Sequence, residues 1–112
     1  MPFLYFFSVC YEYWSFMKEN AYQAELIKKI KRLLPSCIVL KNDANYIQGF
    51  PDLLILYNDT WVGLECKRSA SASRRPNQEY YVNLLNEMSH AWFIYPENEE
   101  EVLNELCKAL GA

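Results

Sequence analysis

Two apolar segments joined by a two-residue turn constrain the fold of this 112-residue chain more than any other feature. Residues 51–57 (PDLLILY) and 60–67 (TWVGLECK) have the length and composition of strands, and Asn58-Asp59 between them is typical of a tight hairpin turn. Because the turn fixes the register of the two strands, we expect Asp52 to lie opposite Glu65 or close to it. The hairpin therefore predicts which polar side chains meet at its open end.

The remaining segments alternate between helical and extended patterns. The elements expected outside the hairpin are, in chain order, a helix at 17–34, a strand at 37–41, a loop at 41–49, a polar loop at 69–75, a helix opened by Pro76, a strand at 91–96 and a helix at 98–110. The resulting order α-β-β-β-α-β-α predicts the α/β class, with a mixed four-stranded sheet flanked by helices. No internal repeat or long linker divides the chain, so we expect residues 17–112 to form a single domain.

The first sixteen residues (1–16) are apolar and aromatic, and Glu12 is their only charged side chain. They lack the basic start and the small-residue cleavage site of a signal peptide, and they are shorter than the ~20 residues that a membrane-spanning helix needs. Three interpretations stay open: an extra strand, an interface element, or an extension that begins at a start codon upstream of Met17. None of them predicts a membrane partner.

The charge distribution gives mixed evidence on a nucleic-acid partner. The net charge of −3 and the pI near 5.1 argue mildly against one. Acidic residues are concentrated in the last sixteen positions, whereas basic residues are clustered at Lys28, Lys29, Lys31 and Arg32 and again at Lys67, Arg68, Arg74 and Arg75. The first cluster is equally compatible with a ligand-binding surface and with an ordinary solvated helix face.

The four cysteines indicate a reducing compartment. Cys10, Cys37, Cys66 and Cys107 form no CxxC pair and have no zinc-binding spacing. Three of them lie in apolar runs, where a reduced cysteine packs as a small hydrophobic residue. We therefore expect the protein to be cytoplasmic.

Asp52, Glu65 and Lys67 are the residues that suggest chemistry. Side chains at positions i and i+2 of a strand share a face, so Glu65 and Lys67 project together while Cys66 points to the opposite face. Three charged groups at the end of such apolar strands need compensation. A Mg²⁺ ion would supply it, because Mg²⁺ favours one or two carboxylates together with water and phosphate oxygens, and the lysine would orient the water that attacks a phosphodiester. The alternative is a structural ion pair at the end of a hairpin.

The residues around this set resemble the motif of the PD-(D/E)XK nuclease superfamily, with Pro51-Asp52 as its first half and Glu65-Cys66-Lys67 as its second. The combination of Gly49-Phe50-Pro51-Asp52, Glu65-Cys66-Lys67 and Gln78 in the next helix resembles the VRR-NUC family, in particular its small stand-alone phage-type members. The likeness extends over about residues 17–95.

The resemblance implies a restriction-endonuclease-like αβββαβ core and cleavage of DNA that depends on Mg²⁺, or on Mn²⁺ as its substitute. It implies that Asp52, Glu65 and the backbone carbonyl of Cys66 ligate the metal. Lys67 would be the catalytic lysine, and Gln78 would belong to the catalytic site.

The same resemblance also bears on substrate and partners. Stand-alone members are similar to Holliday-junction resolvases, which implies branched or structured DNA as the substrate, a homodimer, no organic cofactor, and the cytoplasm of a bacterial or phage-infected cell. Two alternatives stay open: a restriction-like or nicking nuclease that cuts duplex DNA, and a non-catalytic DNA-binding module on the same fold.

The family also places a glutamate on the first helix, at the edge of the site, and this sequence offers Glu19 and Glu25. By helical phase, Glu19 falls within the apolar stripe that contains Leu26, whereas Glu25 falls on the opposite, solvated side. We therefore choose Glu19 as a candidate metal ligand. The alternative is that the helix begins after Glu19, which would leave a solvated acid at its first turn.

Basic residues near the motif are candidates for DNA contacts. Arg68, Arg74 and Arg75 in the loop that follows it, with Lys41 before the hairpin, would contact phosphates that flank the scissile bond. His90, the only histidine, lies at a helix-to-strand junction and is expected at the surface, away from the site, which excludes histidine-dependent hydrolases. The aromatic content exceeds what so small a core buries, which also favours an interface such as that of a homodimer.

Overall fold

The computed structural model describes the backbone of residues 3–112 and the side chains of residues 17–112. Its elements are, in chain order, α1 (Phe3–Leu33), β1 (Ile38–Lys41), β2 (Leu53–Tyr57), β3 (Thr60–Cys66), α2 (Pro76–Met88), β4 (His90–Ile94) and α3 (Glu99–Leu110). This order confirms the predicted α/β class. The strand boundaries differ from the predicted ones by one or two residues.

The four strands form one mixed sheet in the order β1-β2-β3-β4. β1, β2 and β3 are antiparallel neighbours, and β4 lies parallel to β3 at the sheet edge. A parallel pair needs a crossover, which α2 provides between β3 and β4. Tyr57 pairs with Thr60 across the turn, where Asn58 has a φ of 53°, so the hairpin forms where the sequence predicts it.

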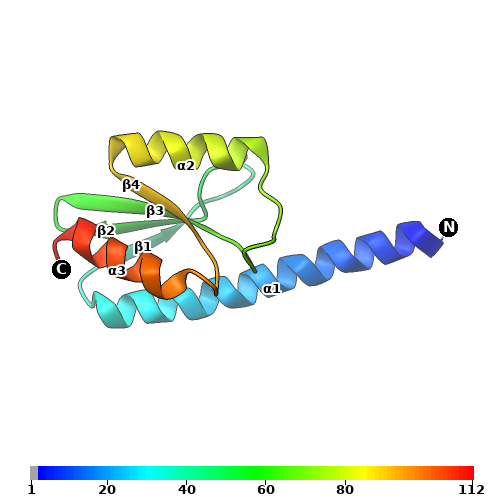
Figure 1. Ribbon diagram of the computed structural model, residues 1–112, viewed down its shortest axis with the longest axis horizontal. Helices are drawn as coiled ribbons and strands as arrows, with labels where there is room; N and C mark the ends of the chain where they lie inside the picture. The colour runs from blue at the N-terminus through cyan, green and yellow to red at the C-terminus, as the bar shows by residue number, and fades with distance from the viewer. Residues whose placement is uncertain (1–2) are drawn as a thin grey trace.

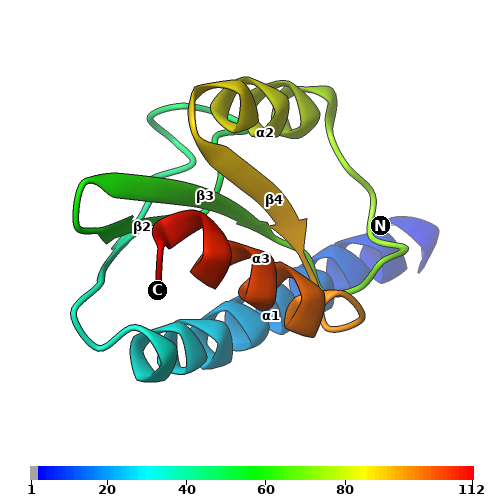
Figure 2. The same ribbon diagram turned by 60° about the vertical axis from the view of Figure 1, so that its left-hand side comes forward.

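Helices cover both faces of the sheet (Figures 1 and 2). α1 and α3 lie on one face and α2 lies on the other. The main core is on the α1/α3 face, where Leu26 of α1 and Leu106 of α3 pack with Leu64 of β3, all of them without exposed surface. α2 covers a smaller cluster that contains Leu85 and Ala91. The α2 face of the sheet therefore has room for polar residues.

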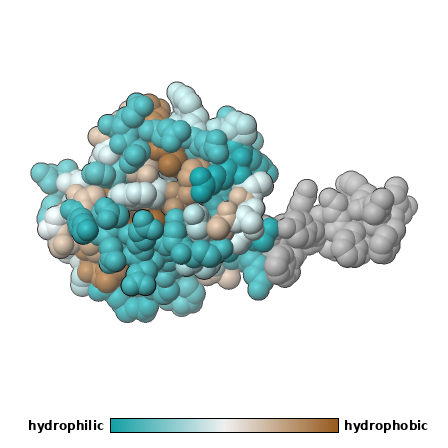
Figure 3. Space-filling view, in the orientation of Figure 1, coloured by the Kyte–Doolittle hydropathy of each residue, from teal (hydrophilic) through white to brown (hydrophobic). Residues whose placement is uncertain are grey.

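Exposed apolar side chains are scattered over the described surface. Ile38 and Leu40 of β1 are 56% and 44% exposed, and Met88 at the end of α2 is 67% exposed. Figure 3 shows one face, where hydrophilic residues predominate and hydrophobic residues form small separate patches. Single exposed apolar residues of this kind are normal for a folded domain.

α1 is longer than the sequence pattern predicts, because it begins at Phe3 instead of about Met17. Residues 3–33 contain no glycine or proline, so no residue interrupts the helical backbone before the apolar stripe begins near Leu26. Residues 3–16 are therefore helical and are not an extra strand. This half of α1 extends past the end of the sheet (Figure 1). Among the described residues, no helix is both long and apolar enough to cross a membrane.

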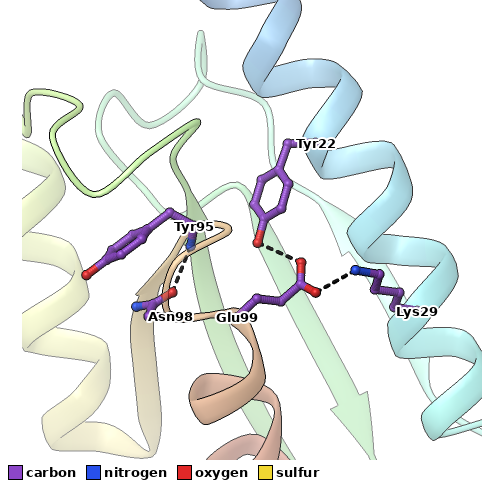
Figure 4. Close-up of polar contacts among 5 residues, drawn as sticks. All are labelled: Tyr22, Lys29, Tyr95, Asn98 and Glu99. Carbon is purple, nitrogen blue, oxygen red and sulfur yellow. Dashed lines mark hydrogen bonds and ion pairs between the residues drawn. The ribbon is translucent and has the colours of Figure 1, made fainter.

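A side-chain network joins α1 to the start of α3 (Figure 4). The Tyr22 hydroxyl donates to Glu99 Oε1 at 2.9 Å, and Lys29 Nζ pairs with Glu99 Oε2 at 2.6 Å. Glu99 lies in the first turn of α3, where the helix dipole also stabilises a carboxylate. Next to this network, the Tyr95 N–H donates to Asn98 Oδ1 at 2.9 Å and orders the turn between β4 and α3.

The basic cluster at 28–32 is partly explained by these contacts. Lys29 is paired with Glu99, and Lys28 Nζ lies 3.3 Å from Glu25 Oε1 on the same helix. These pairs favour the structural interpretation of the cluster, as a helix surface that packs beside an acidic helix, over a dedicated ligand surface.

We expect Leu26→Ala to lower the free energy of unfolding by about 2–4 kcal/mol, because it leaves a cavity in the main core. Leu33→Ala is the matched control, since Leu33 is a leucine of the same helix but is 52% exposed. Its effect should stay within about 1 kcal/mol. Urea denaturation followed by circular dichroism measures both, and equal losses in the two variants would contradict the described packing of α1.

Candidate active site

The register of β2 and β3 brings Asp52 beside Glu65. Leu53 pairs with Leu64, so the next position along each strand places residue 52 opposite residue 65, as predicted. Asp52 Oδ2 accepts a hydrogen bond from the Cys66 N–H at 2.9 Å. This bond holds the Asp52 carboxylate against the end of β3.

Alternation along β3 separates Cys66 from its two charged neighbours. The Cys66 side chain is 2% exposed and belongs to the main core on the α1/α3 face. Glu65 and Lys67 therefore share the α2 face, as the sequence predicts, and they are only 3% and 6% exposed. The Lys67 N–H donates to Ile94 O at 2.9 Å, so the pairing with β4 continues one residue beyond the strand.

Gln78 in the first turn of α2 links the two charged residues. Its Oε1 accepts a hydrogen bond from Lys67 Nζ at 2.7 Å, and its Nε2 donates to Glu65 Oε1 at 3.2 Å. The Arg75 N–H also donates to Oε1, at 3.0 Å. One amide therefore contacts both members of the charged pair and satisfies a free N–H group at the start of its helix.

Gly49 sets the distance between the loop before β2 and the first turn of α2. Its φ is +86°, and a Cβ atom at this position would lie 2.9 Å from the carbonyl carbon of Asn77. Only glycine fits, because the backbone conformation and the close approach both exclude a side chain. The loop and the helix enclose a cavity of about 450 Å³ whose lining includes Asp52, Glu65 and Gln78.

Burial and mutual repulsion make the two carboxyl groups difficult to ionise together. Burial, followed by the charge of Asp52, raises the pKa of Glu65 to about 9. Burial also raises the pKa of Asp52, although its hydrogen bond from the Cys66 N–H and the charge of Lys67 act in the opposite direction. Without a cation, the pair therefore retains a proton at neutral pH.

The oxygen atoms of this pair fit a hard divalent cation. When Glu65 is ionised, its buried Oε2 atom accepts no hydrogen bond from the described residues, which is rare for a buried acceptor. In the metal-free, protonated form, Glu65 instead forms a hydrogen bond with Asp52. In the part of the chain whose side chains are described, no three His, Cys, Asp or Glu residues form a metal site by themselves. Asp52 and Glu65 would therefore need the Cys66 carbonyl, water and phosphate oxygens as further ligands, a mode of coordination that suits Mg²⁺.

Glu19 lies at the edge of this site, on α1. Burial raises the pKa of Glu19, the nearby charges of Lys67 and Asp52 act on it in opposite directions, and the Arg68 N–H donates a hydrogen bond to its carboxylate. Glu25 is exposed on the other side of the helix. The positions of both residues agree with the helical phase, and the alternative in which α1 begins after Glu19 is wrong.

Two of the four basic residues proposed to contact DNA lie beside the cavity. Lys41 is exposed at the end of β1, and its charge lowers the pKa of Asp52, so the two side chains are electrostatically coupled. Arg75 precedes α2, is exposed, and lines the cavity together with Gln78. Their positive charges partly offset those of the carboxylates.

The other two basic residues lie in the loop after β3. Arg68 directly follows Lys67, and its charge acts on Glu19. The Arg74 guanidinium lies 4.0 Å from the centre of the Phe93 ring, a cation–π contact that holds this loop against β4. Arg74 therefore has a structural partner in addition to any role toward DNA.

The remaining sequence expectations concern His90 and the cysteines. His90 is exposed at the start of β4 and stacks on Trp92, with ring centres 5.7 Å apart, so its surface position is confirmed. Cys37, Cys66 and Cys107 are free thiols, and Cys10 lies outside the residues whose side chains are described.

Two contacts that shape the site have no clear signal in the sequence. Glu97 Oε2 accepts a hydrogen bond from the Ala70 N–H at 2.9 Å and so ties the 69–75 loop to the turn after β4. Gly49 is visible in the motif, but its close partner Asn77 is not, because the contact joins segments separated along the chain.

Comparison with family models, with curated proteins and with solved structures finds no match to this chain. A function must therefore be inferred from the residues and the geometry of the site.

We expect Gly49→Ala to lower the free energy of unfolding by about 2 kcal/mol or more, because it combines left-handed backbone strain with a clash against Asn77. Gly111→Ala is the matched control: Gly111 also has a positive φ, of +76°, but its Cβ would meet open space. The free energy of unfolding of this control should fall by only about 1 kcal/mol. Thermal denaturation compares the two, and equal losses would show that Gly49 is not closely packed against α2.

We expect the metal-free protein to become less stable as the pH rises from about 5 to about 9. Glu65 holds its proton more tightly in the folded state, where its pKa is about 9, than in the unfolded state, where it is near 4.5. Ionisation at higher pH therefore favours unfolding. Glu65→Gln should remove most of this slope and stabilise the metal-free protein by about 1–3 kcal/mol at pH 7.

Urea denaturation in EDTA at several pH values measures this effect. Glu25→Gln is the control, because Glu25 is exposed and should leave the pH dependence unchanged. A stability of the wild type that does not vary over this pH range would contradict the burial of an unsatisfied carboxyl group.

Proposed function

We propose that this protein is a Mg²⁺-dependent DNA endonuclease, with Mn²⁺ as a substitute for Mg²⁺. The observation that supports it most is the meeting of Asp52, Glu65 and Lys67 at the open end of the hairpin, with one buried Glu65 oxygen that lacks a donor. The same three residues, with Gln78, resemble the motif of the VRR-NUC family within the PD-(D/E)XK superfamily, whose restriction-endonuclease-like core is compatible with the observed sheet.

In this proposal each charged residue has a separate role in phosphodiester hydrolysis. A bound Mg²⁺ would activate a water molecule and offset negative charge on the phosphate. Asp52 and Glu65, with the Cys66 carbonyl, would hold the ion, and Glu19 would reach it from α1, directly or through water. Lys67 would orient the attacking water and stabilise the charge that develops on the phosphate oxygens.

Gln78 positions Lys67 in this mechanism. Its Oε1 accepts from Lys67 Nζ while its Nε2 donates to Glu65, so the amide bridges the ammonium group and the Glu65 carboxylate. The water oxygen bonds to phosphorus, one ester oxygen leaves with a proton, and the DNA strand is broken. The reaction needs no oxidant, reductant or organic cofactor.

A purely structural ion pair explains this arrangement less well. A buried pair is stable only when further hydrogen bonds satisfy its charges. Here Glu65 and Lys67 are buried beside the partly buried Asp52, and one oxygen of the ionised Glu65 is left without a donor. The unfavourable free energy of burying these charges at the edge of a 450 Å³ cavity is expected of a functional site.

Branched DNA, as in a Holliday junction, is the substrate that the family resemblance favours. The exposed Lys41, Arg74 and Arg75 and the partly buried Arg68 would contact its phosphates. A homodimer is part of the same proposal, because two sites are needed to cut two strands in register. Ile38 and Leu40 on the exposed edge of β1 are apolar side chains available for such an interface.

We expect purified protein to cut a four-way junction in the presence of Mg²⁺ and to cut neither the junction nor a linear duplex of matched sequence in EDTA. Lys67→Met should reduce the cleavage rate at least ~100-fold while leaving DNA binding nearly unchanged, because it removes charge stabilisation near the phosphate but keeps the length of the side chain. Lys28→Met is the matched control, since Lys28 is an exposed lysine that pairs with Glu25 on its own helix.

Circular dichroism shows whether the variants are folded, and gel electrophoresis of end-labelled DNA measures cleavage. Equal cutting of junction and duplex would favour the restriction-like or nicking alternative. Absence of Mg²⁺-stimulated cleavage on either DNA by the wild type, together with DNA binding, would leave the non-catalytic binding module.

A further inference from the structure

A row of aromatic rings leads away from the cavity that contains Asp52 and Glu65. Phe50 lines this cavity and also a second one of about 440 Å³, formed with Tyr46 and Ile47 of the loop before β2. The Phe50 and Tyr81 rings make an edge contact with centres 5.5 Å apart. Tyr81 in turn contacts Tyr80 at 5.1 Å, so the rings form a continuous series across the loop and α2.

The outer members of this aromatic series are exposed. Tyr46 is 84% exposed and Tyr80 is 60% exposed, whereas Phe50 and Tyr81 are partly buried between them. Unlike singly exposed apolar residues, aromatic residues that adjoin one another and a cavity form a continuous patch, and such patches are typical of binding surfaces. Tyr81 packs against Tyr80, and Phe50 lines the second cavity together with Tyr46, so the partly buried rings connect the two exposed tyrosines.

The chemistry of the surroundings indicates a nucleobase as the ligand. Any of the four nucleobases can stack on a tyrosine ring, because each has a flat aromatic face. The side chains of Asn42, Asn45 and Gln48 along the two cavities offer polar groups to base edges. Lys41 and Arg75 lie on the side of the carboxylates, where the phosphates of the same strand would pass. Paired bases inside a duplex present no free face for such stacking.

We propose that this aromatic series, Phe50, Tyr81 and Tyr80, together with Tyr46 in the second cavity, binds unpaired nucleotides next to the phosphodiester that is cleaved. The inference rests on the proposed nuclease function and narrows its substrate from branched or structured DNA in general to DNA that has unpaired bases beside the scissile bond. Phe50 lines both cavities, so a base stacked on the tyrosines is adjacent, along one strand, to a phosphate at Asp52 and Glu65.

The test measures binding and cleavage separately. In EDTA, fluorescence anisotropy gives the affinity of the protein for a labelled 15-nucleotide oligothymidylate and for a blunt 15-base-pair duplex. Tyr46→Ala and Tyr80→Ala should each weaken binding of the single strand roughly five- to 100-fold, the range expected for loss of one base–aromatic stack, and should change duplex binding less than twofold. Tyr46→Phe and Tyr80→Phe keep the ring and should bind the single strand like the wild type.

Cleavage with Mg²⁺ then compares a duplex that contains a short unpaired segment with the same duplex fully paired. The wild type should cut the first faster, and both alanine variants should lose that preference. Alanine variants that bind and cut both DNAs in the wild-type ratio would overturn the inference and leave the nuclease proposal intact. Tyrosine-dependent binding of the single strand without any cleavage would support the inference about the aromatic series and contradict the nuclease function.

Discussion

The hydrogen bond from the Cys66 N–H to the Asp52 carboxylate is the interaction on which the site depends. The β2–β3 register ends at the pair of Leu53 and Leu64, and this hydrogen bond keeps Asp52, the residue just before β2, next to β3. The alternation of side chains along β3 places Glu65 on the same face of the sheet as Asp52. Two acids are brought together by the geometry of a hairpin, although their mutual repulsion opposes it.

The fold compensates for this repulsion with an unusual set of neighbours. Lys67 supplies positive charge, and Gln78 offers an acceptor to the lysine and a donor to Glu65. An amide suits this position because it is neutral and has both kinds of group, whereas a third carboxylate would increase the repulsion and a second lysine would repel Lys67. The remaining unsatisfied oxygen of Glu65 is what a bound cation would complete.

The larger apolar core and the buried charged residues lie on opposite faces of one sheet. The α1/α3 face contains the larger apolar core, and the Tyr22–Glu99–Lys29 network ties its two helices together. The α2 face contains a smaller apolar cluster, the charged residues and the cavity. Because the first face supplies most of the buried apolar area, the second can accommodate buried charges and exposed aromatic rings without loss of the fold.

The sequence by itself determined the order of the elements, the hairpin, and the shared face of Glu65 and Lys67, because these follow from local periodicity and from a turn of two residues. It also separated Glu19 from Glu25, since helical phase is local. Only the tertiary structure decided that Gly49 packs against Asn77, that Gln78 joins Lys67 to Glu65, and that the rings of Phe50, Tyr81 and Tyr80 form one series. These contacts join residues distant in the chain or depend on close packing, which no local pattern of polar and apolar residues encodes.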